Sequence, residues 1–254
     1  IIAVQGLGFT LDQIREMQQT LALAPYQSRY RMVLIPDFQN ATIGASNALL
    51  KSLEEPPSRA LLILTADAKE SLLETIASRC EVVRLRPTSI ETLEYYLQEE
   101  KKIAPARAKR LAHLAGGRVG TALSFDQNQD LLDAYDDALT DLADLLNARL
   151  RQRLQYVERL QQRKGASREQ FAFLIATWLT FWRDVMIRRE GANIPLVNID
   201  HEQQINETAQ LIPSGQIEKI LKEHEKALVN LDANLNPRLV IENLILGFPL
   251  LRVA

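Results

Sequence analysis

The apolar residues near the start of the chain recur at spacings of three and four, which predicts an amphipathic helix. These residues are Leu11, Ile14, Met17 and Leu21. Thr10 and Gln13 fit a capping box, in which each side chain bonds the backbone N–H of the other, so the helix is expected to begin there. It is expected to end at about Ala24, before Pro25.

Three later runs of residues have the composition of β-strands. Residues 30–35 and 60–65 are nearly continuous aliphatic runs, as in strands that are buried on both faces. Residues 81–85 alternate between charged and aliphatic side chains, which predicts a further strand. Cys80, at the start of that strand, is interpreted as a small buried apolar residue and not as a reactive thiol.

A helix is predicted between the first two of these strands, with its end marked by Pro56 and Pro57. Its apolar stripe consists of Ala45, Leu49, Leu50 and Leu53. Glu54 and Glu55 occupy its last turn, where the helix dipole disfavours each negative charge by about 0.3–1 kcal/mol. This departure from the usual charge pattern indicates that a group outside the helix interacts with these carboxylates.

From residue 88 onward the pattern is helical. Three short helices are expected first, at residues 88–102, 106–115 and 120–125. A capping box of Thr88 and Glu91 opens the first of them, and the glycine pair that begins at Gly116 ends the second.

A long apolar repeat follows, at steps of three and four residues, and predicts one extended helical segment that ends at Gly165. Its members are Leu131, Tyr135, Leu139, Leu142, Leu146, Leu150, Leu154, Val157 and Leu160. Aspartates lie toward its start, namely Asp130, Asp133, Asp136, Asp137, Asp141 and Asp144, and basic residues lie toward its end, namely Arg149, Arg151, Arg153, Arg159, Arg163 and Lys164. This order of charge complements the helix dipole, so we interpret these side chains as a solvated face. A nucleic-acid groove lined by the basic residues is the alternative.

The next helix opens with a capping box of Ser167 and Gln170 and is apolar on most sides. Its large apolar residues are Phe171, Phe173, Leu174, Ile175, Trp178, Leu179, Phe181 and Trp182. Such a helix lies either at the centre of a bundle or in a subunit interface. After a loop at residues 191–201, two more helices are expected, at residues 214–231 and 236–247.

The composition is that of a soluble globular protein, with 46% hydrophobic and 24% charged residues among 254. A formal net charge of −2 provides no basic surface for unaided nucleic-acid binding. The single cysteine excludes an intramolecular disulfide and a zinc site built from several cysteines, and it fits a reduced, cytoplasmic setting. The histidines have no metal-ligand spacing, no glycine-rich phosphate loop or secretory signal occurs, and no apolar run reaches the ~20 residues of a membrane span.

Two segments carry a resemblance to a known family. Residues 46–57, with the sequence SNALLKSLEEPP, and residues 75–80, with the sequence TIASRC, resemble motifs of the clamp-loader branch of the AAA+ ATPases. Within that branch they resemble the delta-prime-type subunits of bacterial DNA polymerase III. The resemblance covers most of residues 10–125, and the remainder of the chain matches only in its helical pattern.

The resemblance implies three parts and a predominantly helical fold. They are the rear part of an α/β AAA+ core that lacks the P-loop (residues 1–87), an all-α lid (88–125) and an all-α helical-bundle collar for oligomerisation (126–254). Members of the family carry the phosphate loop upstream of the motifs seen here, so the chain is interpreted as an N-terminally truncated member.

In the family, the arginine that corresponds to Arg79 crosses a subunit interface and touches the γ-phosphate held by the neighbouring subunit. A guanidinium is planar, permanently charged and forked, so it can stabilise the charge that spreads over the transferred phosphoryl group. Ser78 is expected to position this loop. Lys51, Glu54 and Glu55 are expected to help shape the interface.

The resemblance also implies that this chain does not hydrolyse ATP. In the hydrolysing subunits, the strand that corresponds to residues 30–35 ends in two acids, one for Mg²⁺ and one for the attacking water. Here the two positions are Pro36 and Asp37, so the metal ligand is missing and no metal site is expected; the alternative is that Asp37 serves as the ligand after a one-residue shift. The nucleotide-sensing arginine of the lid corresponds to Gly120, unless Arg118 takes its place.

The implied function is that of a non-hydrolysing delta-prime-type subunit that supplies an arginine finger while the sliding clamp is loaded onto DNA. No cofactor is expected on this chain, because ATP and Mg²⁺ belong to the neighbouring subunits. The expected partners are gamma/tau-type and delta-type subunits and, through the assembly, the clamp and primed DNA, with no membrane contact. The alternatives are a fragment of an ATP-hydrolysing gamma/tau-type subunit and a helical scaffold with a borrowed AAA+ core.

Overall fold

The computed structural model describes residues 2–3, 9–22, 29–162 and 167–251. The chain divides into two compact units, residues 1–85 (unit 1) and 86–254 (unit 2), and each has its own hydrophobic core. Several predicted features lie outside the described residues, namely the end of the first helix near Ala24 and Pro25, the basic residues Arg163 and Lys164, and Gly165. Helices predominate in the described part, as the sequence predicts.

The described part of unit 1 contains a parallel three-stranded sheet in the order β1-β2-β3. The strands are β1 (Ile2–Ala3), β2 (Arg31–Ile35) and β3 (Ala60–Leu64). β2 and β3 agree with the predicted strands to within one residue at each end. β1 has no counterpart in the sequence-based prediction, because a strand of two residues is too short to show a pattern.

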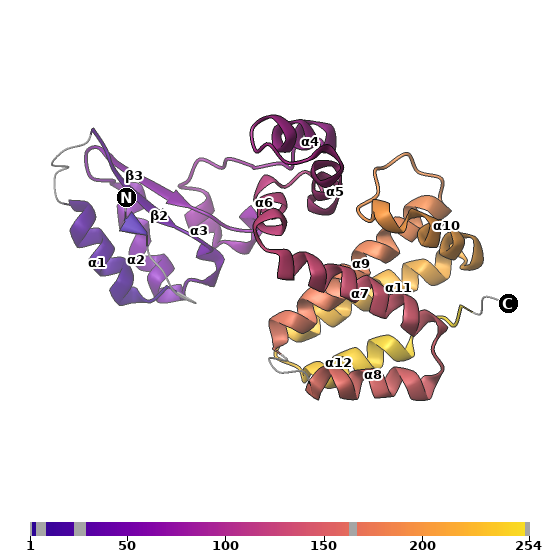
Figure 1. Cartoon of the computed structure of the whole chain (residues 1–254). Helices are drawn as coiled ribbons and strands as arrows, with labels where there is room; N and C mark the ends of the chain where they lie inside the picture. Colours follow the sequence, from indigo (N-terminus) through magenta and orange to yellow (C-terminus); the bar gives the residue numbers. More distant parts are fainter. Residues whose placement is uncertain (1, 4–8, 23–28, 163–166, 252–254) are drawn as a thin grey trace. The chain divides into compact units, whose positions relative to one another are not determined.

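Two helices connect the strands and cover one face of the sheet (Figure 1). They are α1 (Leu11–Ala22) and α2 (Ile43–Glu54). Crossovers between parallel strands are right-handed, so both helices lie on the same side. The side-chain amide of Gln18 in α1 donates to the carbonyl of Ala48 and to the hydroxyl of Ser52 in α2, each at 2.8 Å. These bonds tie the two helices together over the sheet.

The starts of both helices follow the rules of helix capping. The capping box of α1 is confirmed: the N–H of Thr10 donates to Oε1 of Gln13 at 2.9 Å, and the N–H of Gln13 donates to Oγ1 of Thr10 at 3.4 Å. α2 begins after Thr42, whose hydroxyl accepts the N–H of Ala45 at 3.2 Å. Ala45 and Leu49, from the predicted apolar stripe, are fully buried.

Residues 81–85 do not form a strand, and this prediction from the sequence is wrong. Val83 is 75% exposed and Leu85 is 93% exposed, and no described strand lies beside them. An alternating pattern becomes a strand only where a neighbouring strand supplies hydrogen-bond partners. Cys80 is half-buried against the core of unit 1, and this burial raises the pKa of its thiol.

Unit 2 begins with three short helices, as the sequence predicts. They are α4 (Ile90–Glu99), α5 (Pro105–Ala115) and α6 (Val119–Gln127). The cap of α4 is Ser89, whose hydroxyl accepts the N–H of Thr92 at 3.1 Å, and the prediction of Thr88 as the cap is wrong. Thr88 instead donates its N–H to the carbonyl of Gly117 at 3.0 Å. Gly117 has a φ of 81°, and a Cβ there would lie 2.0 Å from the carbonyl oxygen of Thr88, so this close approach requires glycine.

The long helix predicted after α6 is in fact two helices, α7 (Gln129–Asn147) and α8 (Leu150–Gln162). The backbone is extended at Ala148, and neither glycine nor proline marks the break in the sequence. Arg149, Arg151 and Arg153 therefore lie at the beginning of a helix and not near the end of one. A helix dipole disfavours positive charge at its N-terminus, so the dipole-based interpretation is wrong for these arginines. It holds for Asp130 in the first turn of α7 and for Arg159 in the last turn of α8.

Arg153 is buried where the ends of two helices meet, with 6% of its surface exposed. Its Nε donates to the carbonyls of Leu145 and Ala148, at the end of α7, at 3.0 Å each. Its Nη atoms donate to three carbonyls at the end of α12 (Pro237–Leu246), those of Ile245, Phe248 and Pro249, at 3.3, 2.7 and 2.7 Å. Burial lowers the pKa of Arg153. The placement of this residue on a solvated face, expected from the sequence, is wrong.

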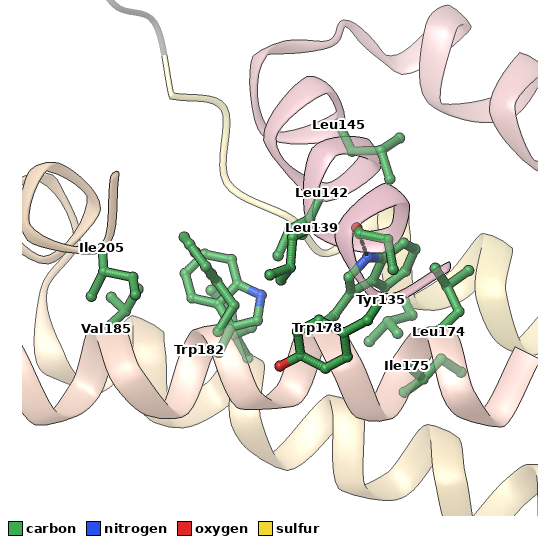
Figure 2. Close-up of a cluster of buried hydrophobic side chains, with 14 of the residues drawn as sticks. Tyr135, Leu139, Leu142, Leu145, Leu174, Ile175, Trp178, Trp182, Val185 and Ile205 are labelled. Carbon is green, nitrogen blue, oxygen red and sulfur yellow. Dashed lines mark hydrogen bonds between the residues drawn. The ribbon is translucent and has the colours of Figure 1, made fainter. Parts of the chain in front are cut away.

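α9 (Arg168–Arg189) is the central helix of unit 2, and its capping box of Ser167 and Gln170 is confirmed. Trp178 and Trp182 are fully buried, and Nε1 of Trp178 donates to the carbonyl of Ala138 in α7 at 2.8 Å. Figure 2 shows both tryptophans among leucines of α7 such as Leu142. Of the two alternatives for this helix, the structure supports the centre of a bundle.

The remaining helices of unit 2 are α10 (Glu202–Leu211), α11 (Ser214–Asp232) and α12. α11 and α12 agree with the predicted helices, and Asn236 caps α12 by accepting the N–H of Arg238 at 3.0 Å. α10 has no counterpart in the sequence-based prediction. Its buried residues Ile205, Thr208 and Ala209 have the spacing of a helix, and this pattern could have revealed it.

The loop between α9 and α10 is attached to α9 by Asp184, which is fully buried. Its carboxylate accepts the N–H groups of Val197 and Asn198 at 2.9 and 2.7 Å, and the side-chain amide of Asn198 at 2.9 Å. The hydroxyl of Tyr135 donates to the other end of that amide at 2.7 Å. The polar groups of this network therefore satisfy one another inside the core.

His224 on α11 is another buried polar residue, with its ring stacked on Phe248 at a centroid distance of 5.6 Å. Its Nδ1 lies 2.7 Å from the carbonyl of Ile220. Burial lowers the pKa of His224 from 6.5 to about 4. The folded protein therefore keeps this ring neutral at pH values where the unfolded chain protonates it.

Lowering the pH from 7 to 5 is expected to reduce the free energy of unfolding of unit 2 by about 2 kcal/mol through His224. The stabilisation is complete above pH 6.5 and is lost as the pH falls toward 4, because only the unfolded chain takes up the proton in that range. Urea titrations at both pH values, followed by tryptophan fluorescence, measure it. His224→Phe should lack this part of the pH dependence, whereas His201→Gln should retain it. An unchanged pH dependence in His224→Phe would contradict the assignment.

Candidate functional site

Arg79 lies just after the short helix α3 (Glu74–Ala77). Its Nε donates to Oε1 of Glu54 at 2.7 Å, and its Nη2 forms an ion pair with the same oxygen at 2.6 Å. Its Nη1 donates to the carbonyl of Thr75 at 2.9 Å. The side chain of Arg79 is 36% exposed and that of Glu54 is 50% exposed. The structure thus joins two residues that the sequence singles out separately, and it leaves the guanidinium in contact with solvent.

The other residues predicted for this site lie on the same two elements. The hydroxyl of Ser78 donates to the carbonyl of Thr75 at 3.3 Å, the carbonyl that Arg79 also uses. Lys51 and Glu55 are exposed at the end of α2, and the N–H of Glu55 donates to the carbonyl of Lys51 at 3.0 Å. Their participation in an interface stays a prediction.

Pro36 and Asp37 lie at the carboxyl edge of the sheet, where α/β proteins commonly bind ligands. Pro36 offers no carboxylate there. Asp37 is exposed and has a left-handed backbone, with a φ of 50°. Its N–H donates to the hydroxyl of Thr65 at 3.0 Å, which places the residues that follow β2 and β3 side by side. The alternative role of Asp37 as a lone metal ligand stays a prediction.

The part of the chain that the structure describes contains no group of three or more His, Cys, Asp or Glu side chains that could hold a metal ion. In unit 2, Gly120 is exposed in the first turn of α6, and Arg118 is the exposed residue directly before that helix. None of the described helices combines the length and apolar character that crossing a membrane requires.

Comparison with known proteins places these residues in a family context. Residues 1–89 match the family described as DNA polymerase III, delta subunit. The delta-prime subunit of DNA polymerase III from Bacillus subtilis is 24% identical over 267 residues, covering 97% of this chain and 74% of that protein. The delta-prime subunit from Haemophilus influenzae is 33% identical over 100 residues, covering 39% of this chain and 31% of that protein.

The chain is similar to bacterial delta-prime subunits of DNA polymerase III. This confirms the resemblance that residues 46–57 and 75–80 carry. The tau subunit of DNA polymerase III from Bacillus subtilis is also similar, with 23% identity over 256 residues that cover 91% of this chain and 45% of that protein. The chain therefore spans about three quarters of one delta-prime relative and less than half of the other two proteins.

Arg153 does not contribute to the nucleic-acid groove that is the alternative interpretation of the basic residues around α8. Arg153 is buried and bonded to carbonyls, so a nucleic acid cannot reach it. A cavity of about 400 Å³ beside α8 is lined by Asp141 and Asp144 as well as by Arg159. A lining of mixed charge gives little attraction for a phosphate backbone.

The sequence-based prediction does not include two residues that bond to Asp37 and Arg79 in this chain, namely Thr65 and Thr75. Thr65 has no role in the sequence-based prediction, yet its hydroxyl fixes the backbone of Asp37. The pairing of Ile35 with Leu64 in parallel strands could have revealed their proximity. Thr75 lies four residues before Arg79, so a helical turn there predicts that its carbonyl is within reach of the guanidinium.

Proposed function

We propose that this chain is a non-hydrolysing, delta-prime-type subunit of the clamp loader of bacterial DNA polymerase III. Arg79 acts as an arginine finger on the γ-phosphate of ATP bound to a neighbouring gamma/tau-type subunit. A delta-type subunit completes the assembly, which acts in the cytoplasm. Through the assembly, the chain takes part in placing the sliding clamp on primed DNA. ATP and Mg²⁺ belong to the neighbours.

The observation that carries this proposal is the position of the Arg79 guanidinium. It is partly exposed beside the end of α2, where Lys51 and Glu55 are exposed as well. An arginine in this position keeps its full charge and can approach a phosphate that another chain presents. Such a group stabilises the charge on the equatorial oxygens during phosphoryl transfer without any chemistry of its own.

The residues after β2 support the non-hydrolysing part of the proposal. A hydrolysing site needs a carboxylate for Mg²⁺ and a second group to orient the attacking water. Pro36 cannot supply the first group, and the left-handed backbone of Asp37 is tied to Thr65. Asp37 alone cannot fill both roles at once.

An ATP-hydrolysing subunit of the tau type is the second candidate function. The similarity to a tau subunit over most of the chain favours it, as does the exposed carboxylate of Asp37. In that case Asp37 would bind Mg²⁺, and the full-length protein, with a phosphate loop, would turn over ATP without a partner.

The two candidates differ in a measurable way. The full-length protein by itself is expected to show no ATP hydrolysis above the blank, and its addition to purified gamma/tau-type and delta-type subunits is expected to raise hydrolysis by the assembly. Steady-state release of inorganic phosphate measures both quantities. Hydrolysis by the isolated full-length protein would favour the tau-type candidate, and an assembly that hydrolyses ATP equally well without it would contradict the proposal.

A further inference from the structure

The guanidinium of Arg79 is held along one edge and free for contact along another. A guanidinium carries five N–H donors: one on Nε and two on each Nη. Nε donates to Glu54, Nη1 donates one N–H to the carbonyl of Thr75, and Nη2 forms an ion pair with Glu54. Each Nη atom carries two N–H groups, so each has a donor beyond these contacts to offer a phosphate.

Glu54 is well placed to hold the arginine in this orientation. It is the last residue of α2, a helix that packs on the core of unit 1 through Ala45 and Leu49. The position of the carboxylate is therefore set by a packed helix and not by a loop. The end of a helix is unfavourable for a negative charge, and the cation of Arg79 compensates for it. The negative charges at the end of α2 predict that a group outside the helix interacts with them, and the guanidinium of Arg79 is such a group.

We propose that Glu54 is a positioning residue for Arg79. Its carboxylate orients the guanidinium so that the Nη atoms face a phosphate of the neighbouring subunit. This inference rests on the proposed function of Arg79. Arginine has a long side chain with many rotamers, and all but one are lost when the side chain binds a phosphate. A side chain that is ordered beforehand loses less freedom in the transition state.

The contact with Glu54 leaves the arginine able to act. The hydrogen bond from Nε and the ion pair of Nη2 both involve one carboxylate oxygen, Oε1, on the edge formed by these two nitrogens. The approach of a phosphate to the two Nη atoms does not require that edge to open. Glu54 therefore orients the guanidinium and does not compete with the phosphate for the same donors.

The test compares Glu54→Ala and Glu54→Gln in the reconstituted assembly. Glu54→Ala is expected to lower kcat for ATP hydrolysis about tenfold, with KM for ATP unchanged, because the finger acts on the transition state. Glu54→Gln should restore most of kcat, since its carbonyl oxygen can accept the same hydrogen bond from Nε. Glu70→Ala, which removes an exposed carboxylate elsewhere in unit 1, is the matched control and should leave kcat unchanged. An unchanged or increased kcat in Glu54→Ala would overturn the inference.

A second measurement separates this inference from the proposed function. In the full chain labelled with ¹⁵N, the Nε–H of Arg79, identified by its absence in Arg79→Lys, should exchange slowly with solvent, and faster in Glu54→Ala. Equal exchange rates would show that Glu54 does not order the side chain, and would overturn the inference. If Arg79→Ala lowers hydrolysis and Glu54→Ala does not, only the inference fails. If Arg79→Ala has no effect, the proposed function fails and the inference with it.

Discussion

Replacing Arg79 with alanine is expected to lower ATP hydrolysis at the adjoining site of the assembled complex by about a thousandfold or more. The expectation follows from the charge that develops on the phosphoryl oxygens, which a single guanidinium supplied in trans stabilises by several kcal/mol. Binding of ATP should change little, because the contact strengthens only in the transition state. Single-turnover hydrolysis at that site, with ATP saturating, measures the effect.

Two further variants show whether the effect depends on the planar guanidinium and on the position of Arg79. Arg79→Lys keeps the charge but offers a point charge without a planar fork, so it should recover only a small part of the rate. Arg84→Ala removes another exposed arginine of unit 1 and should leave the rate unchanged. Gel filtration of each assembly shows whether the subunits still associate. A wild-type rate of ATP hydrolysis in an intact complex that contains Arg79→Ala would exclude the role of Arg79 as an arginine finger.

Replacing Arg153 with leucine is expected to reduce the free energy of unfolding of unit 2 by about 3–5 kcal/mol. The five carbonyls that it bonds, at the ends of α7 and α12, lose this donor together, and those of Leu145 and Ile245 keep a backbone N–H donor at 3.3 and 3.2 Å. A buried carbonyl without a donor costs the full penalty of its desolvation. Leucine fills part of the volume but donates no hydrogen bond.

The controls for Arg153 come from the same helix. Arg151→Leu removes an exposed arginine of α8 and should change the stability by less than about 0.5 kcal/mol. Arg153→Lys should fall between the two, because one ammonium cannot reach both helix ends. Trp178 and Trp182, the only tryptophans, lie beside this region, so their fluorescence in a urea titration reports on unit 2 alone. A loss below 1 kcal/mol in Arg153→Leu would contradict the account of the helix ends.

Much of the fold follows from local patterns that the sequence shows directly. The capping boxes at Thr10 and Ser167 and the cap at Asn236 predict helix starts, because each depends only on residues three or fewer positions apart. The two long aliphatic runs predict β2 and β3 for the same reason. The prediction fails where a distant partner decides the outcome. Residues 81–85 alternate, but a strand needs a neighbour that no local pattern reveals.

The burial of Arg153 also depends on distant partners that no local pattern reveals. Its charge and its place in a helical repeat predict exposure, whereas its burial depends on carbonyls about ninety residues further along. The sequence predicts both Arg79 and Glu54 as site residues, through motifs and an unusual helix end. It does not predict their bond, because the two residues belong to separate elements whose packing sets the distance.

Asp184 has a consequence for how this part of the fold tolerates change in length. One buried carboxylate receives the consecutive amides of Val197 and Asn198, so the segment that leaves α9 must return to the helix after a set number of residues. An insertion or deletion between Gly191 and Leu196 would carry those amides away from their acceptor, and the buried carboxylate would keep its contact with Nη1 of Arg183, at 3.1 Å. Extra residues are better accommodated at the exposed turn near Asn234, where the backbone is already left-handed and solvent surrounds the chain.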